Sequence, residues 1–336
     1  MIRRPAIVAA ALAVALGCKK PPPTTDTTTT ATAAPTPPPT PTIPPFVAPA
    51  PLPAGDAWLL GTDGTVRIDI KGTTTREAQT FVAIAQGKDG TPFASSWSAL
   101  FRRDTKGWTK VLSYGDKTRG ALLTSKHTEL AMTGGGAVVT LLSDALWSGR
   151  VETNALSFGT KLDLSPRALD GRGQVWGGGL GDSKLYLANP AGGGTESMVV
   201  ATWAPSSIVA LAGRRTGGVY VLGHESVVVG GGDKETAKTF RLPNKIDKGT
   251  IAVSDNGTAV VRTDGSTLLF VGPDGGCKIL AQQSGEVFAV DGRSRVWTVV
   301  GEDLKVIGSD GKVTSQKAMV KAPVAILPVG GGPDLK

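Results

Sequence analysis

Side chains that could do acid–base or metal chemistry are few and widely separated in this chain. The 336 residues include two histidines, His127 and His224, and two cysteines, Cys18 and Cys277. A tetrahedral metal site needs closely grouped nitrogen, sulfur or oxygen ligands, and these four residues do not have that spacing. No CxxC, HExxH, GxSxG or phosphate-loop pattern occurs. We therefore expect no metal, no cofactor and no catalytic residue, and Asp, Glu, Lys or Tyr would have to supply any general acid or base.

Charged residues recur instead at regular places between short apolar runs. An acidic set consists of Asp63, Asp144, Asp182, Glu225, Asp264, Glu302 and Asp303. A basic set consists of Lys88, Arg172, Arg214, Arg215, Arg293 and Arg295. The acidic set could bind a cation or a basic partner. The alternative is that these residues serve hairpin turns, because Asp-Gly favours such turns whatever the function.

A repeat of about 40 residues places these charges. Its pattern is a small residue, two intermediate residues and a bulky one, with the bulky residues at Trp58, Phe93, Val139, Trp176, Tyr220, Val260 and Trp297. Each unit contains four short runs of β-branched and apolar residues, separated by Asp-Gly, Asn-Gly or Gly-Gly turns. Seven units with four strands each predict an all-β fold, a seven-bladed β-propeller over residues 55–336.

Two segments resemble a known repeat. DGRGQVW (170–176) and DGRSRVW (291–297) resemble the D-x-x-G-x-V-W repeats of bacterial sensor-type and NHL-like propellers. In a propeller, turns between second and third strands emerge on one face, and turns between first and second strands emerge on the opposite face. The acidic set would then lie on one face and the basic set on the other, although Asp255 interrupts the basic set and the second unit has no acid. The resulting hypothesis is an electrically polar disc.

The two ends of the repeat region are complementary. The first unit lacks its first strand, and an extra apolar run, Ala322 to Gly332, follows the last complete unit. We predict that this run completes the first blade and closes the ring, which would hide otherwise exposed sheet edges. Pro323 and Pro328 lie at the ends of the run, where a missing backbone donor is tolerated.

We expect the side chain at the repeated position to fill the wedge between blades. Because Phe and Val replace Trp at this position in some units, the size of the side chain matters more than a specific ring. Four tryptophans lie outside the repeat register and are candidates for exposed contacts: Trp97, Trp108, Trp147 and Trp203. Cys277 is expected to pack as a small apolar side chain rather than to react.

The N-terminus has the features of an export signal. A basic start, Met1–Arg4, precedes the apolar run Pro5–Leu16, which is shorter than the roughly 20 residues of a transmembrane helix. The next residues, ending at Cys18, resemble the bacterial lipoprotein signal. That resemblance implies that residues 1–17 are removed and that Cys18 carries lipid; the alternative is an ordinary secretory signal with an unrelated cysteine. Removing Arg3 and Arg4 lowers the net charge from +8 to +6.

Residues 18–54 are predicted to form a disordered tether. The 33 residues from Pro21 to Pro53 contain 13 Pro and 10 Thr, a composition that cannot bury apolar surface. At about 3.1 Å per residue, an extended polyproline-II spacer of this length would reach roughly 100 Å.

Together these features predict a monomeric, lipid-anchored protein of the bacterial cell envelope. Resemblance to lipoprotein sorting signals implies the outer membrane, because Lys19 and Lys20 rather than Asp follow Cys18. We expect a binding or scaffold protein that presents a propeller face to an envelope protein or a cell-wall polymer. We expect no nucleic-acid partner, since the basic residues form no long run. The alternative is an envelope enzyme, a lyase or hydrolase, that uses the axial channel.

Overall fold

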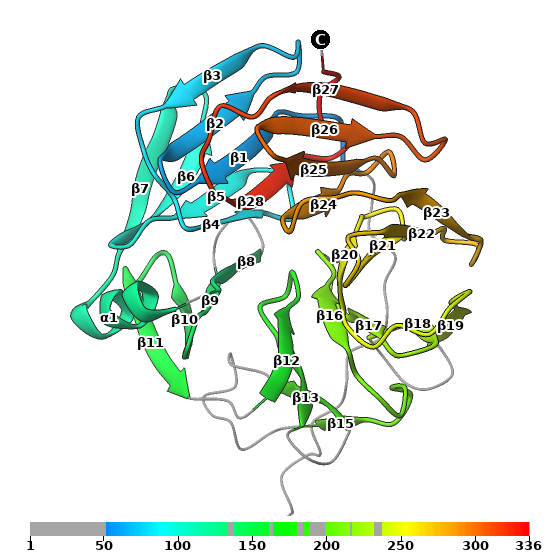
Figure 1. Cartoon of the computed structure of the whole chain (residues 1–336). Helices are drawn as coiled ribbons and strands as arrows, with labels where there is room; N and C mark the ends of the chain where they lie inside the picture. The colour runs from blue at the N-terminus through cyan, green and yellow to red at the C-terminus, as the bar shows by residue number, and fades with distance from the viewer. Residues whose placement is uncertain are drawn as a thin grey trace, which may run out of the picture. The chain divides into compact units, whose positions relative to one another are not determined.

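The computed structural model describes residues 52–125, 127–133, 138–160, 164–179, 184–188, 199–215, 217–231 and 237–335. These residues form seven four-stranded antiparallel sheets arranged as the blades of a ring, with one α-helix (Figure 1). The predicted fold class, a seven-bladed β-propeller, is confirmed. The predicted signal peptide, Cys18, most of the predicted tether and Asp182 lie outside the described residues.

The first three blades contain the following strands, named from the axis outward. Blade 1 consists of β28 (Pro323–Pro328), β1 (Ala57–Gly61), β2 (Gly64–Ile68) and β3 (Thr74–Glu77). Blade 2 consists of β4 (Ala83–Gln86), β5 (Pro92–Ser95), β6 (Ala99–Asp104) and β7 (Gly107–Ser113). Blade 3 consists of β8 (Glu129–Thr133), β9 (Val138–Leu142), β10 (Leu146–Arg150) and β11 (Ala155–Thr160).

The other four blades follow in chain order. Blade 4 consists of β12 (Leu164–Leu169), β13 (Val175–Gly179), β14 (Leu185–Ala188) and β15 (Val199–Ala201). Blade 5 consists of β16 (Ala210–Gly213), β17 (Val219–Leu222), β18 (Ser226–Gly230) and β19 (Lys238–Arg241). Blade 6 consists of β20 (Gly249–Val253), β21 (Ala259–Thr263), β22 (Leu268–Val271) and β23 (Cys277–Ala281). Blade 7 consists of β24 (Phe288–Val290), β25 (Val296–Val300), β26 (Asp303–Ile307) and β27 (Val313–Lys317).

The first strand of each blade contacts the first strands of both neighbouring blades, so these seven strands surround the axis. Because all neighbours in a blade are antiparallel, the turns after the first strands emerge on one face. We call this the AB face; its described turns are residues 87–91, 170–174, 214–215 with 217–218, 254–258 and 291–295. The turns after the second strands, together with the links between blades, emerge on the opposite BC face; the described turns are 62–63, 96–98, 143–145, 223–225, 264–267 and 301–302.

The repeated bulky residue lies on the second strand of every blade. All seven side chains are at most 2% exposed, so the predicted packing role between blades is confirmed. Cys277 packs against the apolar cluster between blades 5 and 6, and burial raises the pKa of its thiol. The interior between blades therefore requires a large apolar side chain at the repeated position, but it does not require a particular aromatic ring.

The prediction for the four other tryptophans is wrong for three of them. Trp147 and Trp203 are 4% and 8% exposed, and Trp108 packs edge-on against Trp58 with 5.0 Å between ring centroids. Trp147 and Trp108 belong to a third and a fourth strand, and Trp203 follows the fourth strand of its blade. The wedge between blades widens outward, so outer strands also need large side chains. Trp97, at 43%, is exposed as expected.

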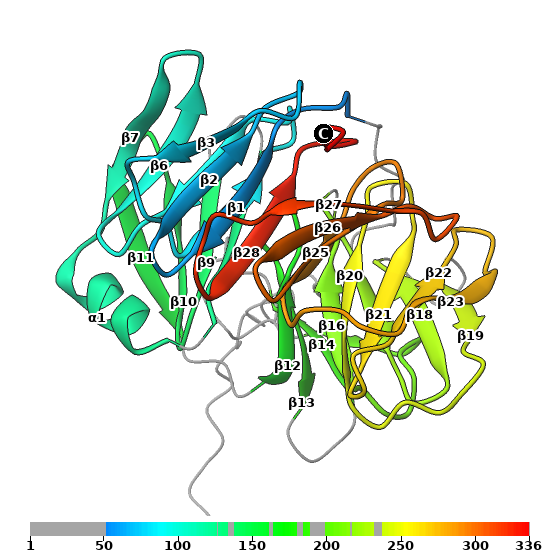
Figure 2. The same ribbon diagram turned by 45° about the horizontal axis from the view of Figure 1, so that its top comes forward.

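The helix α1 (Asp116–Thr124) was not predicted. It lies in the link from blade 2 to blade 3 and stands beside β10 and β11 in both views (Figures 1 and 2). Leu122 and Thr118 are buried, and the Thr124 hydroxyl donates to the Asp144 carboxylate at 3.2 Å. One buried leucine in nine residues produces too weak a helical periodicity to recognise in the sequence. No helix in the described part of the chain is long and apolar enough to span a membrane.

The C-terminal strand closes the ring as predicted. β28 pairs antiparallel with β1, with Ala57 opposite Pro328 and Gly61 opposite Pro323. The two prolines therefore occupy the ends of the pairing, where the lost donors are tolerated.

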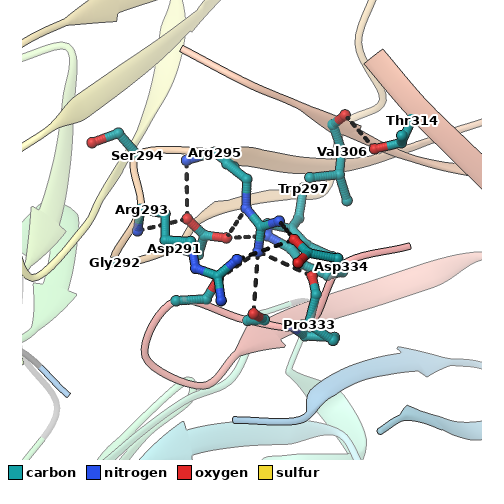
Figure 3. Close-up of polar contacts among 12 residues, drawn as sticks. Asp291, Gly292, Arg293, Ser294, Arg295, Trp297, Val306, Thr314, Pro333 and Asp334 are labelled. Atoms are coloured by element: carbon teal, nitrogen blue, oxygen red, sulfur yellow. Dashed lines mark hydrogen bonds and ion pairs between the residues drawn. The ribbon is translucent and has the colours of Figure 1, made fainter. Parts of the chain in front are cut away.

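Arg295 then fixes the tail beyond β28 to blade 7 (Figure 3). Its Nη1 lies 2.6 Å from the Asp334 carboxylate, and its Nη2 donates to three backbone carbonyls of residues 331–333. Its Nε donates to the buried Asp291 carboxylate at 2.8 Å. One guanidinium thus joins the first turn of blade 7 to the chain that completes blade 1.

This arrangement predicts that replacing Arg295 lowers the free energy of unfolding more than replacing the neighbouring Arg293. Arg295→Met should lower the free energy of unfolding by about 3 kcal/mol, because it leaves the Asp291 carboxylate buried beside a broken ion pair. Arg293→Met should cost less than about 1 kcal/mol, since that more exposed side chain makes one ion pair with Asp334. Urea unfolding of both variants provides the measurement. Equal losses would show that Arg295 does not hold the closure.

Candidate functional site

The AB ends of the first strands surround a cavity of about 290 Å³ on the propeller axis. All seven blades contribute to its lining. Its polar residues are Gln86, Asp170, Arg214, Arg215, Ser254 and Asp255. Apolar residues from blades 1, 2, 3, 4, 6 and 7 also line it, including Ile84, Leu130, Met132, Leu169, Val253, Phe288 and Ile326. A concave site that combines apolar side chains with several polar groups has the general character of a small-molecule site.

Arg215 reaches across the AB mouth of this cavity. Its Nε lies 2.7 Å from the carboxylate of Asp255 in blade 6, and its Nη1 donates to the Lys88 carbonyl in blade 2 at 3.0 Å. Blades 5 and 2 are not neighbours in the ring, so this side chain bridges opposite parts of the mouth. Both partners of the ion pair are mostly buried, which strengthens their attraction relative to a surface pair.

Arg214 is a buried cation in the wall of the same cavity. Its residue is 4% exposed, and its guanidinium carbon lies 5.9 Å from the centre of the Tyr220 ring. Burial lowers the pKa of Arg214, although a guanidinium stays charged at neutral pH. The Gly171 amide donates to the Arg214 carbonyl at 2.7 Å. Only glycine permits this approach of two turns, because a Cβ at residue 171 would lie 1.6 Å from the Arg215 carbonyl oxygen.

Asp170 is committed to holding its turn. Its two carboxylate oxygens accept four N–H groups: the backbone amides of Arg172, Gln174 and Gly218, and the indole of Trp176, at 2.9 to 3.1 Å. Burial raises the pKa of Asp170, while the donors oppose that rise. With every lone-pair direction occupied, this carboxylate is a structural brace and is not placed to exchange protons with a substrate.

Asp291 makes the corresponding contacts in blade 7. It accepts the Trp297 indole at 2.9 Å and the backbone amides of Arg293 and Arg295 (Figure 3). The D-x-x-G-x-V-W segments therefore encode a carboxylate that braces a turn and fixes the tryptophan six residues later. The sequence showed the motif, and the structure supplies the role of its aspartate.

The basic set lies entirely on AB-face turns. Three of its members are paired with acids on the same face: Arg215 with Asp255, Arg295 with Asp291 and Asp334, and Arg293 with Asp334. Arg214 and Arg215 line the axial cavity, whereas Lys88, Arg172, Arg293 and Arg295 lie outside its lining. Part of the positive charge of this face is therefore balanced locally.

The described acidic residues lie at the BC face: Asp63, Asp144, Glu225, Asp264, Glu302 and Asp303. Asp63 pairs with Arg76 at 3.0 Å and accepts the Lys321 amide, and these bonds lower its pKa. Lys317 lies 3.1 Å from Asp303 and 3.5 Å from Glu302. Basic side chains thus reach this face as well, and the electrically polar disc stays a prediction.

Both histidines lie away from the axial cavity. The His127 ring pairs with Glu129 at 2.8 Å, which raises the pKa of His127, and His224 contacts the Ile246 carbonyl at 2.8 Å. Within the described ranges, no group of three or more His, Cys, Asp or Glu residues has the geometry of a metal site.

Four polar residues of the cavity lining were not among the predicted site residues: Gln86, Asp170, Ser254 and Asp255. For Ser254, the sequence contains an observation that bears on its position. The residue six positions before the bulky residue is Asp170 or Asp291 in blades 4 and 7, but Arg214 and Ser254 in blades 5 and 6. Blades 1, 2 and 3 also lack the aspartate, with Leu52, Gly87 and Thr133 at this position, so its absence alone does not identify the cavity residues.

No protein-family model and no curated protein matches the sequence, so the resemblance to NHL-like repeats stays a prediction. Among solved structures, the chain is similar to a streptogramin B lyase (10% identity, TM-score 0.49, 78% of this chain and 87% of that one). It is also similar to BamB from Moraxella catarrhalis (10% identity, TM-score 0.44, 85% and 93%). A third is the extracellular domain of the BT4673 system from B. thetaiotaomicron (16% identity, TM-score 0.48), where 79% of this chain spans 34% of that one. The likeness concerns the fold alone.

The bracing role of Asp170 can be tested against a second turn aspartate. Asp170→Ala should lower the free energy of unfolding by about 3 kcal/mol, because it leaves buried N–H donors without acceptors. Asp89→Ala in blade 2 is the matched control; that carboxylate accepts only the amide and hydroxyl of Thr91 in an exposed turn, and its loss should cost less than about 1 kcal/mol. Urea unfolding followed by tryptophan fluorescence measures both. An Asp170→Ala protein as stable as the parent would contradict the assignment.

Proposed function

We propose that this chain is a lipid-anchored binding or scaffold protein of the bacterial cell envelope, whose propeller presents one face to an envelope protein or a cell-wall polymer. The observation that supports it most is the closed ring with braced turns. On the turn that carries Trp97, the Ser96 hydroxyl accepts the Ser98 and Ala99 amides, so this turn is held before any partner arrives and little conformational entropy is lost on binding.

The BC face is the face proposed to meet the partner. The first described residues enter at the AB face, where the Gly55 amide donates to the Val329 carbonyl at 3.0 Å. They run beside the C-terminal tail (Figure 2). The tether assigned to residues 18–54 would therefore join the propeller at its AB face and leave the BC face facing away from the attachment point.

The exposed apolar side chains of the BC face include Trp97, Leu123 and Met319. Trp97 is 43% exposed in the second turn of blade 2, and Leu123 is 67% exposed on α1. The Tyr114 amide donates to the Ser98 carbonyl at 2.8 Å, so the segment leading into α1 contacts the turn that carries Trp97. An exposed tryptophan is typical of protein-docking surfaces.

The proposal assigns no reaction to the axial cavity. Its two carboxylates are engaged, Asp170 by four N–H donors and Asp255 by the Arg215 guanidinium. A general acid or base must be within reach of a substrate proton, and neither group is presented in that way.

Lipid anchoring is tested by replacing the predicted lipidated cysteine. Cys18→Ser should move the protein from the membrane fraction to the soluble fraction, since a multiply acylated cysteine provides the stable anchor. Cys277→Ser is the matched control and should stay in the membrane fraction. Fractionation followed by immunoblotting measures both, and retention of the Cys18→Ser protein in membranes would refute the anchor.

The proposed partner face is tested by cross-linking in cells and capture of the full-length protein. Trp97→Ser with Leu123→Ser should reduce the recovered partner at least tenfold. Ile279→Ser, an equally exposed apolar site on the rim strand β23, should leave recovery unchanged. Unchanged recovery for the Trp97/Leu123 variant, or an equal loss for Ile279→Ser, would remove the BC face from the proposal.

A further inference from the structure

At the axial cavity, the first turns of blades 5 and 6 differ from those of blades 4 and 7. Where blades 4 and 7 have a bracing aspartate, these blades have Arg214 and Ser254. Blade 5 keeps its turn in place because Asp170 of the neighbouring blade accepts the Gly218 amide at 3.0 Å. Arg214 lies in the wall of the cavity.

The AB end of the cavity carries two arginines and two carboxylates, and one of each is joined in the Arg215–Asp255 ion pair. Arg214 is 4% exposed and Arg215 crosses the mouth. The Arg215 contact with the Lys88 carbonyl brings the blade 5 turn close to the end of β4, which carries Gln86. The Gln86 Nε2 is buried and has no hydrogen-bond partner among the described residues. A buried amide N–H group and a buried cation are both stabilised by an anionic hydrogen-bond acceptor. Apolar contacts do not provide that stabilisation.

We propose that the axial cavity binds a small organic anion, a monocarboxylate with an apolar body, whose carboxylate contacts Arg214 and Gln86. The guanidinium fork matches the two oxygens of a carboxylate, and the amide adds a further donor. The apolar residues of the lining would cover the body of the ligand. The cavity of about 290 Å³ limits that body to a short or medium chain.

The recognition is selective for a single negative charge. Asp170 and Asp255 also border the cavity, and a second carboxylate on the ligand would meet these acids or the apolar wall. A neutral amide of the same length would fill the apolar part but would offer Arg214 only one uncharged carbonyl acceptor in place of two charged oxygens. The charged head should therefore account for most of the affinity.

Calorimetric titration of the detergent-purified full chain with hexanoate and hexanamide tests the proposal. Hexanoate should bind saturably and at least tenfold more tightly than hexanamide. Arg214→Gln should weaken hexanoate binding at least tenfold and leave hexanamide unchanged. Gln86→Leu should weaken hexanoate binding by a smaller factor, and it supplies a second variant if Arg214→Gln fails to fold by circular dichroism.

Arg172→Gln is the matched control. It removes the same charge from a neighbouring AB-face turn, but Arg172 lies outside the cavity lining, so hexanoate affinity should be unchanged. Three results would overturn the proposal: no saturable hexanoate binding by the parent protein, equal affinity for hexanoate and hexanamide, or an equal loss for Arg172→Gln and Arg214→Gln. Hexanedioate should bind at least tenfold more weakly than hexanoate, and equal or tighter binding would also overturn it.

Discussion

The buried ion pair between Asp291 and Arg295 is the contact on which ring closure depends. Asp291 braces the first turn of blade 7, and Arg295 extends from that brace to the carbonyls of residues 331–333 and to Asp334. Blade 1 is built from the two ends of the propeller sequence, so no hairpin connects β28 to β1. Joining segments that are so distant in sequence costs chain entropy. The guanidinium offsets part of that cost by attaching the tail to a turn that is already rigid.

Closure in turn determines the geometry of the axis. Each first strand contacts two neighbours, so a missing β28 would leave β24 and β4 without their common neighbour. The axial cavity is lined by all seven blades, and Arg215 spans its mouth from blade 5 to blade 2. The cavity therefore exists only in the closed ring, which links a packing contact in blade 7 to a possible site at the centre of the molecule.

Repetition explains why much of the fold was predictable and why the site was not. The seven bulky positions and their spacing revealed the number of blades, the packing of Trp297 and its equivalents, and closure by the last strand. Trp147 and Trp203 were misassigned because the repeat was aligned on second strands, whereas the outer part of each wedge also needs bulk. The cavity depends on contacts between blades that face each other across the axis, such as Arg215 with Lys88. A sequence pattern records spacing along the chain and carries no information about such pairs.

The residue six positions before the bulky residue braces the first turn in blade 4 and lines the axial cavity as an arginine in blade 5. This difference is possible because neighbouring turns support each other. In blade 4, Asp170 accepts donors from its own turn and also the Gly218 amide of blade 5. Because one carboxylate braces two turns, blade 5 can carry Arg214 at the equivalent position without losing its turn. A repeat protein thus gains a chemically distinct side chain at its axis where a neighbour supplies the missing brace.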